Sequence, residues 1–245
     1  MRHETHPMRL LDLTLESVVH DVACDEALLI EVDGGQRPAT LRFWETPGYA
    51  VVLGASRRVD RDVHAEACRR DQVPIARRSS GGGTVLLGPG VLSVALAAPF
   101  HEIPGAESVE RAQHYVMNKI ALALEPLAPG LRVEGSGDLA WAGRKCAGSA
   151  QRRLRKALLV HCSILAGLDL ERVDRYLAQP ERQPAYRQGR THDQFLVNLA
   201  APPSVIRAAI KDAWPLEAGE SEPPHPALGD LVEEKFGNPS WIFRL

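Results

Sequence analysis

Three consecutive glycines, at 81–83, constrain this chain more than any other feature of its sequence. They follow RRSS (77–80) and come directly before the apolar, β-prone run TVLL (84–87). Glycine loses more backbone entropy on folding than any other residue, so three together before a strand indicate that something approaches the backbone closely. Backbone N–H groups without side chains form an anion site, and neighbouring arginines can pair with phosphate. The simpler interpretation is a glycine-rich hairpin turn with arginines on a sheet surface.

The composition is that of a globular protein and removes several function classes. The 245 residues are 44% hydrophobic and 24% charged, which suits one large domain with a real core. A net charge of −2 gives no general attraction to nucleic acid or to an anionic membrane. We expect no signal peptide and no membrane span, because no apolar run is long enough. Four cysteines lie far apart without a CxxC pair, so we expect no disulfide framework or zinc site and a cytoplasmic location.

The order of the predicted elements favours an α+β fold, with a central mixed β-sheet and helices packed on it. Strand patterns cover 39–45, 49–54, 73–78, 84–100 (two strands around a Gly-Pro-Gly turn) and 157–168, and 131–153 reads as strand, turn, short strand and a glycine-broken basic segment. Helical patterns start at Asp25 and cover 61–71, 105–127, 170–178 and 203–214. We expect a catalytic domain over 1–215, then a proline-rich surface linker and a short tail with a terminal helix over 216–245.

Two common nucleotide-binding motifs do not account for the glycines. The chain contains no GxxxxGK[ST] sequence, which excludes a standard P-loop. GSGDLA (135–140) satisfies the pattern G-x-G-x-x-A, but the residues after it alternate like a strand instead of opening a helix. We therefore interpret this segment as a turn.

A second basic segment, GDLAWAGRKCAGSAQRR (137–153), places Arg144, Lys145, Arg152 and Arg153 among small residues. Charge clusters are usually solvated loops. Small residues, however, let a ligand come close to the cations, which suits the lining of a site. Lys145 is also one of only five lysines in a chain with 29 basic residues.

RRSSGGG, GDLAWAGRKCAGSAQRR and ALLVHCSIL (157–165), in this order and spacing, resemble the lipoate–protein ligases. These belong to the wider family of biotin and lipoate ligases and octanoyltransferases. DEALL (25–29) and PAYRQGRTHDQFLVNL (184–199) are also similar to that family. The resemblance runs from about residue 22 to residue 200, which is most of the chain.

The resemblance implies an α+β catalytic domain that forms lipoyl-AMP from lipoate and ATP with Mg²⁺. It then implies transfer of the lipoyl group to one lysine of an acceptor, either a lipoyl domain or an H-type protein of glycine cleavage. Lys145 matches the essential catalytic lysine of the family. The substrate- and adenylate-binding residues that the resemblance implies are Arg78, Ser80, Gly81, Gly82, Gly83, Asp138, Ser149, Arg152 and His161. No metal ligand of the protein itself is expected.

The chain departs from the family pattern at three places. Residues 87–91 stand where many ligases have His-Asp-x-Gly-Asn, Gly137 stands where some have asparagine, and Cys162 stands where glycine is usual. We interpret Cys162 as a buried free thiol. The extra C-terminal domain of two-domain ligases is not expected here, so a separate accessory protein or the tail itself would supply its role.

Two alternatives remain open. A lipoyl or octanoyl transferase takes the acyl group from a carrier protein through a cysteine thioester, without ATP. None of the four cysteines matches a known transferase nucleophile, and Cys146, directly after Lys145, would point away from it in an extended segment. A non-catalytic lipoate-binding subunit is the second alternative. Octanoate also remains open as the acid, and biotin is a less favoured substrate.

Overall fold

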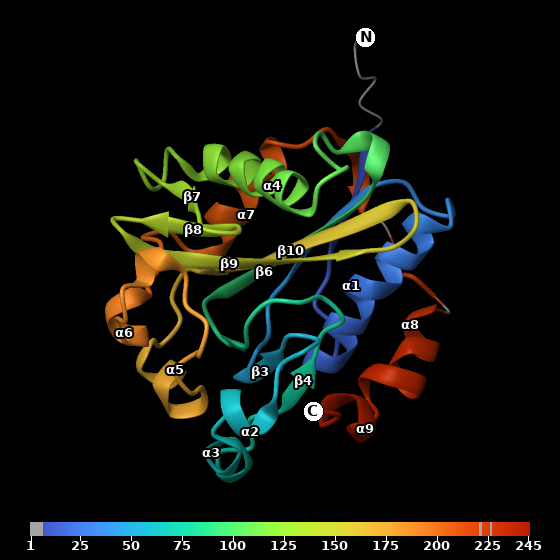
Figure 1. Cartoon of the computed structure of the whole chain (residues 1–245). Coiled ribbons are helices and arrows are strands. Elements are labelled where there is room, and N and C mark those ends of the chain that lie inside the picture. The colour runs from blue at the N-terminus through green and yellow to red at the C-terminus, as the bar shows by residue number, and fades with distance from the viewer. Residues whose placement is uncertain (1–6, 221, 226) are drawn as a thin grey trace.

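Two β-sheets form the framework of the computed structural model, which describes residues 7–220, 222–225 and 227–245. The strands are β1 (Met8–Asp12), β2 (Thr40–Trp44), β3 (Ala50–Leu53), β4 (Ile75–Arg77), β5 (Val85–Leu87), β6 (Val91–Pro99), β7 (Arg132–Glu134), β8 (Asp138–Trp141), β9 (Arg144–Arg153), β10 (Ala157–Leu165) and β11 (Leu216–Glu220). The large sheet has the order β11-β1-β2-β6-β10-β9-β8-β7, and the small sheet has the order β4-β3-β5 (Figure 1). Parallel and antiparallel pairs both occur, which confirms the predicted mixed sheet of an α+β fold.

Helices and the small sheet cover the two faces of the large sheet. Helix α1 (Val18–Asp33) and the small sheet lie on one face, and α4 (Val109–Leu124) and α7 (Pro203–Asp212) lie on the other (Figure 1). The shorter helices are α2 (Val59–Asp62), α3 (Ala65–Arg70), η1 (Phe100–Glu102), α5 (Glu171–Tyr176), η2 (Ala185–Arg187), α6 (His192–Phe195), α8 (Ala227–Leu231), η3 (Val232–Phe236) and α9 (Pro239–Ile242). A hydrophobic core fills each side of the sheet.

Local sequence signals explain where the two long helices begin. Ser17 caps α1 by accepting a hydrogen bond from the amide of His20, and Ser108 caps α4 by accepting one from Arg111. The adjacent strands β6 and β10 are almost entirely buried, because helices cover both faces of the sheet there. The helical pattern read from Asp25 is therefore confirmed, but α1 begins seven residues earlier, at Val18.

Tertiary pairing changed two other sequence-based predictions. The basic segment expected to be broken by glycine is one continuous strand, β9, because β8 and β10 pair with it on its two sides. The predicted surface linker is wrong over Leu216–Glu220, since these residues form β11 and satisfy the edge of β1 in parallel. No helix in the described part of the chain is both long and apolar enough to cross a bilayer.

The C-terminal segment folds back onto α1 and β4. Lys235 Nζ lies 2.6 Å from Glu26 Oε2 on α1. The indole Nε1–H of Trp241 donates to the carbonyl of Arg77 at 3.0 Å. This tail therefore packs directly against the strand that leads into the three glycines.

Candidate functional site

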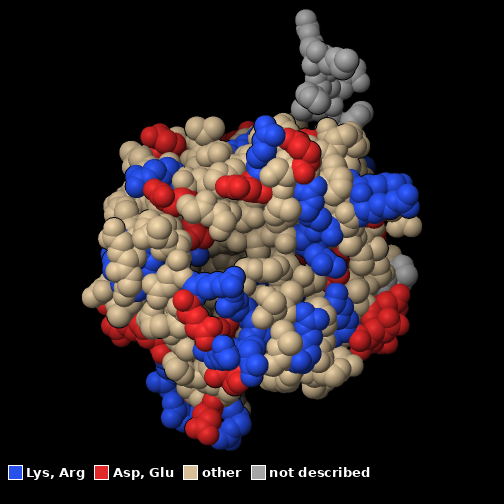
Figure 2. Space-filling view, viewed as in Figure 1, with Lys and Arg blue, Asp and Glu red and all other residues tan. Residues whose placement is uncertain are grey.

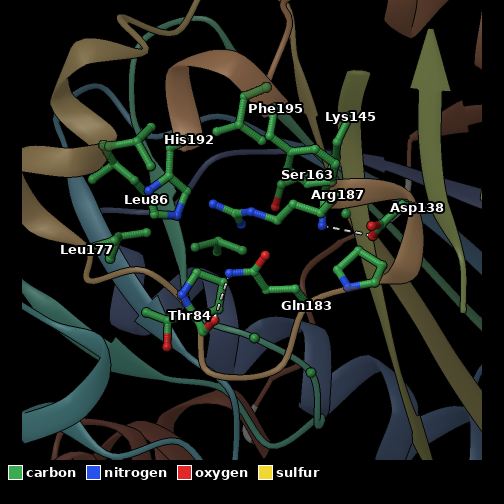
Figure 3. A pocket seen from close by; sticks show the side chains of 18 of the residues that line it. Thr84, Leu86, Asp138, Lys145, Ser163, Leu177, Gln183, Arg187, His192 and Phe195 are labelled. Carbon is green, nitrogen blue, oxygen red and sulfur yellow. Dashed lines mark hydrogen bonds and ion pairs between the residues drawn. The ribbon is translucent and has the colours of Figure 1, made fainter. Parts of the chain in front are cut away.

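Two adjoining cavities lie between the glycine loop (residues 80–84) and strands β8 to β10. The outer cavity has a volume of about 470 Å³, within the usual range of small-molecule sites, and the inner one about 100 Å³. Residues that line both cavities are Gly83, Thr84, Val85, Lys145, Gly148, Ser149 and Ser163. Figure 3 shows Thr84, Lys145, Ser163 and Arg187 around the outer cavity.

Two arginines that line the cavities hold the carbonyls of the glycine loop. Arg78 Nη2 donates to the carbonyls of Gly81 and Gly83 at 2.7 and 2.8 Å, and Arg57 Nε donates to that of Gly82 at 3.2 Å. In a trans peptide the N–H of the next residue points opposite to the carbonyl, so these bonds orient the amides of Gly82, Gly83 and Thr84. The carbonyl of Ser80, which accepts from the amide of Ala55 at 2.8 Å, does the same for the amide of Gly81. Within the described residues, the amides of 81–83 donate to no protein acceptor. Exposed backbone amides without a protein acceptor are the groups that an anion-binding loop requires.

Arg78 adds an unneutralised charge beside this loop and lines the inner cavity. Its side chain is buried and donates to Ser80 Oγ and to the carbonyl of Val52, and no carboxylate among the described residues pairs with it. Burial, and then the nearby Arg57 charge, lowers the pKa of Arg78 to about 10, which still leaves it a cation at neutral pH. A buried cation without a counter-charge favours an anion at the loop.

Arg77 does not belong to the site. Its fully buried guanidinium donates to the carbonyls of Ile242, Gly54 and Arg57 at 2.9, 3.0 and 2.6 Å. The interpretation that both arginines of the motif could pair with a phosphate is therefore wrong for Arg77. Its side chain instead joins Ile242 of the C-terminal tail to the backbone of Gly54 and Arg57.

Lys145 stands where the two cavities meet. Its Nζ lies 2.8 Å from Asp138 Oδ1 (Figure 3). The hydroxyl of Tyr186 donates to Asp138 Oδ2 at 2.9 Å. Burial, and then the Asp138 carboxylate, raises the pKa of Tyr186, so its hydroxyl stays protonated. A Cβ added to Gly148 would lie 2.8 Å from Lys145 Nζ, so glycine gives this amine its room.

Ser149 is held by neighbours rather than left free. Its hydroxyl donates to the carbonyl of Gly137 at 2.5 Å and accepts from Gln113 Nε2 at 2.7 Å. Gly137 has φ +127°, and a Cβ there would lie only 2.6 Å from Ser149 Oγ. The departure from asparagine at Gly137 is therefore matched by a backbone that requires glycine.

The remaining predicted residues divide into two groups. His161 lines the inner cavity and contacts Ser80, which lies buried behind the loop. Arg152 is exposed and lines neither cavity. The departing residues 87–91 form the end of β5, a turn and the start of β6, and they also line neither cavity.

Several lining residues had no distinctive sequence signal of their own. Arg57, Arg182 and Arg187 give the outer cavity three further cations. Arg187 is buried, donates to Gln179 Oε1 at 2.6 Å, and has a pKa lowered by burial. Figure 2 shows a hollow on the displayed face with basic side chains at its rim. The sequence indication for Tyr186 and Arg187 was the segment 184–199, which contains both and resembles the family.

No cysteine offers a reactive thiol at this site. All four are free and buried. Burial raises the pKa of Cys146 and of Cys162 to about 12. Cys146 Sγ donates to the carbonyl of Leu139 at 3.3 Å, on the side away from Lys145, which confirms the predicted orientation. Cys162 lines the inner cavity as a buried thiol.

Comparison with known proteins assigns the chain to a family. The sequence model of the lipoyl protein ligase A/B catalytic domain matches residues 18–202, well over half of the chain. The chain belongs to this family. All the motif residues described above lie within the matched region.

Relatives in the lipoyl protein ligase A/B family carry two kinds of name. A protein of Aeropyrum pernix named "Putative lipoate-protein ligase A" is 32% identical over 166 residues, 68% of this chain and 60% of that protein. An "Octanoyltransferase LipM" of Kyrpidia tusciae is 28% identical, and the match covers 96% of this chain and 98% of that protein. The chain thus matches less than two thirds of the Aeropyrum relative.

Solved structures of family members share the fold. A lipoate-protein ligase A bound with ATP has a TM-score of 0.83 at 18% identity, over 97% of this chain and 99% of that one. A bi-partite lipoate protein ligase of Thermoplasma acidophilum, described with its E2 lipoyl domain, has a TM-score of 0.82 at 20% identity. That match covers 97% of this chain and 96% of the Thermoplasma chain.

Proposed function

We propose that this chain is an ATP-dependent lipoate–protein ligase, which activates lipoate or octanoate as the acyl-adenylate and transfers it to a lysine of an acceptor. One observation carries the proposal. Gly83 and Lys145 line both cavities, Gly82 lines the outer one and the Arg78 cation lines the inner one. The amides of 81–83 have no protein acceptor among the described residues. This arrangement suits a ligand that is anionic at its centre.

The chemistry of adenylation requires such an arrangement. Attack of a carboxylate on the α-phosphate brings two anions together and adds charge to the phosphate oxygens. Fixed N–H groups and cations in a site with little water stabilise that charge. The Asp138–Lys145 pair holds the amine in place before the ligand binds. A phosphate or carboxylate oxygen would then replace Asp138 as a partner of Nζ or share it.

The state of the cysteines favours a ligase over a transferase. A transferase of this family would need a thiolate that attacks a carrier-bound acyl group. Burial keeps Cys146 and Cys162 protonated, with pKa values of about 12. Among the described cysteines only Cys162 touches a cavity, and its burial opposes formation of the thiolate.

ATP would enter as its Mg²⁺ complex. Asp62 and Asp138 are the two carboxylates that line the outer cavity, and either would contact the substrate's Mg²⁺. Arg57, Arg182 and Arg187 would neutralise the phosphates. Arg152 remains a predicted contact that a bound nucleotide would have to reach.

The acceptor and the location follow from the same proposal. A lipoyl domain, or an H-type protein of glycine cleavage, would present the lysine that receives the acyl group. The Thermoplasma ligase is described as bi-partite, which supports a separate accessory protein for the transfer step here. The reaction would take place in the cytoplasm. We also propose that the catalytic unit predicted over 1–215 extends through β11 (Leu216–Glu220), because this strand pairs with β1 in the large sheet.

The test is isotope exchange between ATP and pyrophosphate, measured with and without lipoate or octanoate. A ligase gives acid-dependent exchange and a trapped acyl-adenylate. Acyl transfer from a carrier protein without ATP, together with background exchange, would establish the transferase. Binding of lipoate with neither reaction would establish a binding subunit. Lys156→Ala, at an exposed lysine that lines neither cavity, serves as the matched charge-loss control.

A further inference from the structure

A buried line of polar side chains connects helix α1 to the glycine loop. Arg42 Nη1 donates to Asp25 Oδ1 at 2.6 Å, and Asp25 Oδ2 lies 3.2 Å from His161 Nδ1. His161 Nε2 then lies 2.6 Å from Ser80 Oγ, which also accepts from Arg78 Nε at 3.0 Å. These residues come from α1, β2, β10 and the loop.

Charge and burial give every hydrogen bond in this line a direction. Burial opposes ionisation of Asp25, but the charge of Arg42 and the hydrogen bond from His161 outweigh it and lower the pKa of Asp25. The ionised carboxylate can only accept, so Nδ1 of His161 carries the proton. In the neutral ring Nε2 then accepts, and the hydroxyl of Ser80 donates to it. Ser80 Oγ keeps its lone pairs for Arg78.

Both ring nitrogens of His161 are therefore occupied by protein groups. The imidazole lines the inner cavity, yet neither nitrogen is free to contact a substrate or take its proton. Its position instead determines where Ser80 lies. Ser80 in turn fixes Arg78, whose guanidinium holds the carbonyls of Gly81 and Gly83.

We propose that Asp25 is a positioning residue for the glycine loop: it fixes the Nδ1–H form of His161 and so orients Ser80, Arg78 and the loop amides. This deepens the proposed function and rests on it, because the oriented loop is the proposed adenylate site. A displacement of about 1 Å at such a site costs on the order of 100-fold in rate.

Glu26 supplies a matched control on the same helix. Its carboxylate is also buried, but it pairs with Lys235 at 2.6 Å and does not contact His161. Glu26→Gln removes a buried charge next to Asp25 and leaves the line intact. A merely structural role for Asp25 predicts that Asp25→Asn and Glu26→Gln lose stability and activity in parallel.

The first measurement does not depend on enzyme activity. Nitrogen-15 NMR of the ring nitrogens, with His161→Gln used to assign the signal, should show the Nδ1–H form in the wild type and in Glu26→Gln. Asp25→Asn should lose this form. An Nε2–H form of His161 in the wild type would overturn the inference whatever the enzyme does.

The second measurement is a double-mutant cycle in adenylation. Asp25→Asn and Ser80→Ala should each lower kcat/KM by a factor on the order of 10 to 100. Asp25→Asn should have little further effect in the Ser80→Ala background, because both act through the same loop. Independent, multiplicative losses would overturn the inference. If Asp25→Asn fails to fold, a normal rate in Ser80→Ala decides against it. Absence of ATP/pyrophosphate exchange in the wild type would refute the proposed ligase function. The NMR measurement of the His161 tautomer would still test the positioning role of Asp25.

Discussion

Removal of the Lys145 amine should abolish most of the activity and leave the fold intact. Lys145 lines both cavities, and among the described residues Asp138 is the one carboxylate that pairs with its Nζ. Loss of one fixed donor at a site of developing negative charge lowers kcat by a factor on the order of 100 to 1000. Lys145→Ala should therefore slow adenylation by that factor.

The stability cost of the same change should be small. The side chains of Lys145 and Asp138 are 26% and 18% exposed, so water already screens the pair. Such a pair contributes about 1 kcal/mol or less, and Asp138 keeps the hydroxyl of Tyr186. Circular dichroism and thermal unfolding should remain close to those of the wild type.

Lys145→Arg separates charge from shape. The backbone of Gly148 passes so near Nζ that an added Cβ would lie 2.8 Å from it. A guanidinium is a planar fork and needs more room than an ammonium. We expect Lys145→Arg to lose at least about tenfold in rate although the charge remains.

Acid-dependent ATP/pyrophosphate exchange measures the effect, and Lys156→Ala is the control. Lys156 is exposed at the turn between β9 and β10, so its loss should leave the rate unchanged. A near-normal rate in folded Lys145→Ala would show that this lysine lines the cavity wall without taking part in the reaction. The assignment of the site would then be refuted.

Four further substitutions test other parts of the structure. Cys146→Ser and Cys162→Ala should each keep most of the exchange activity, and a trapped acyl-thioester on either residue would instead favour the transferase. Gly137→Ala should lower activity by at least about tenfold, because its Cβ would lie 2.6 Å from Ser149 Oγ; a normal KM and kcat would contradict this. Trp241→Phe should lower the free energy of unfolding by about 1 kcal/mol, measured by urea denaturation, through loss of one hydrogen bond; unchanged stability would show that the bond contributes nothing.

Local sequence patterns determined the fold class and the central motif of this protein. Alternating and helical periodicities, with their turns, locate most strands and helices, since each depends on residues close together in the chain. The glycines at 81–83 likewise predict an exposed backbone. Lys145 stood out because lysine is rare in this chain and small residues surround it.

Only the tertiary structure decided which groups act together. The sequence places Arg78 beside the glycines, and only the structure shows that it lines the inner cavity and also binds the carbonyls of Gly81 and Gly83. Asp25 and His161 are 136 residues apart and meet through the packing of α1 on β10. Strand β11 likewise forms because β1 offers it an unpaired edge. Hydrogen-bond partners far apart in sequence are fixed by packing, and no local pattern of residues encodes them.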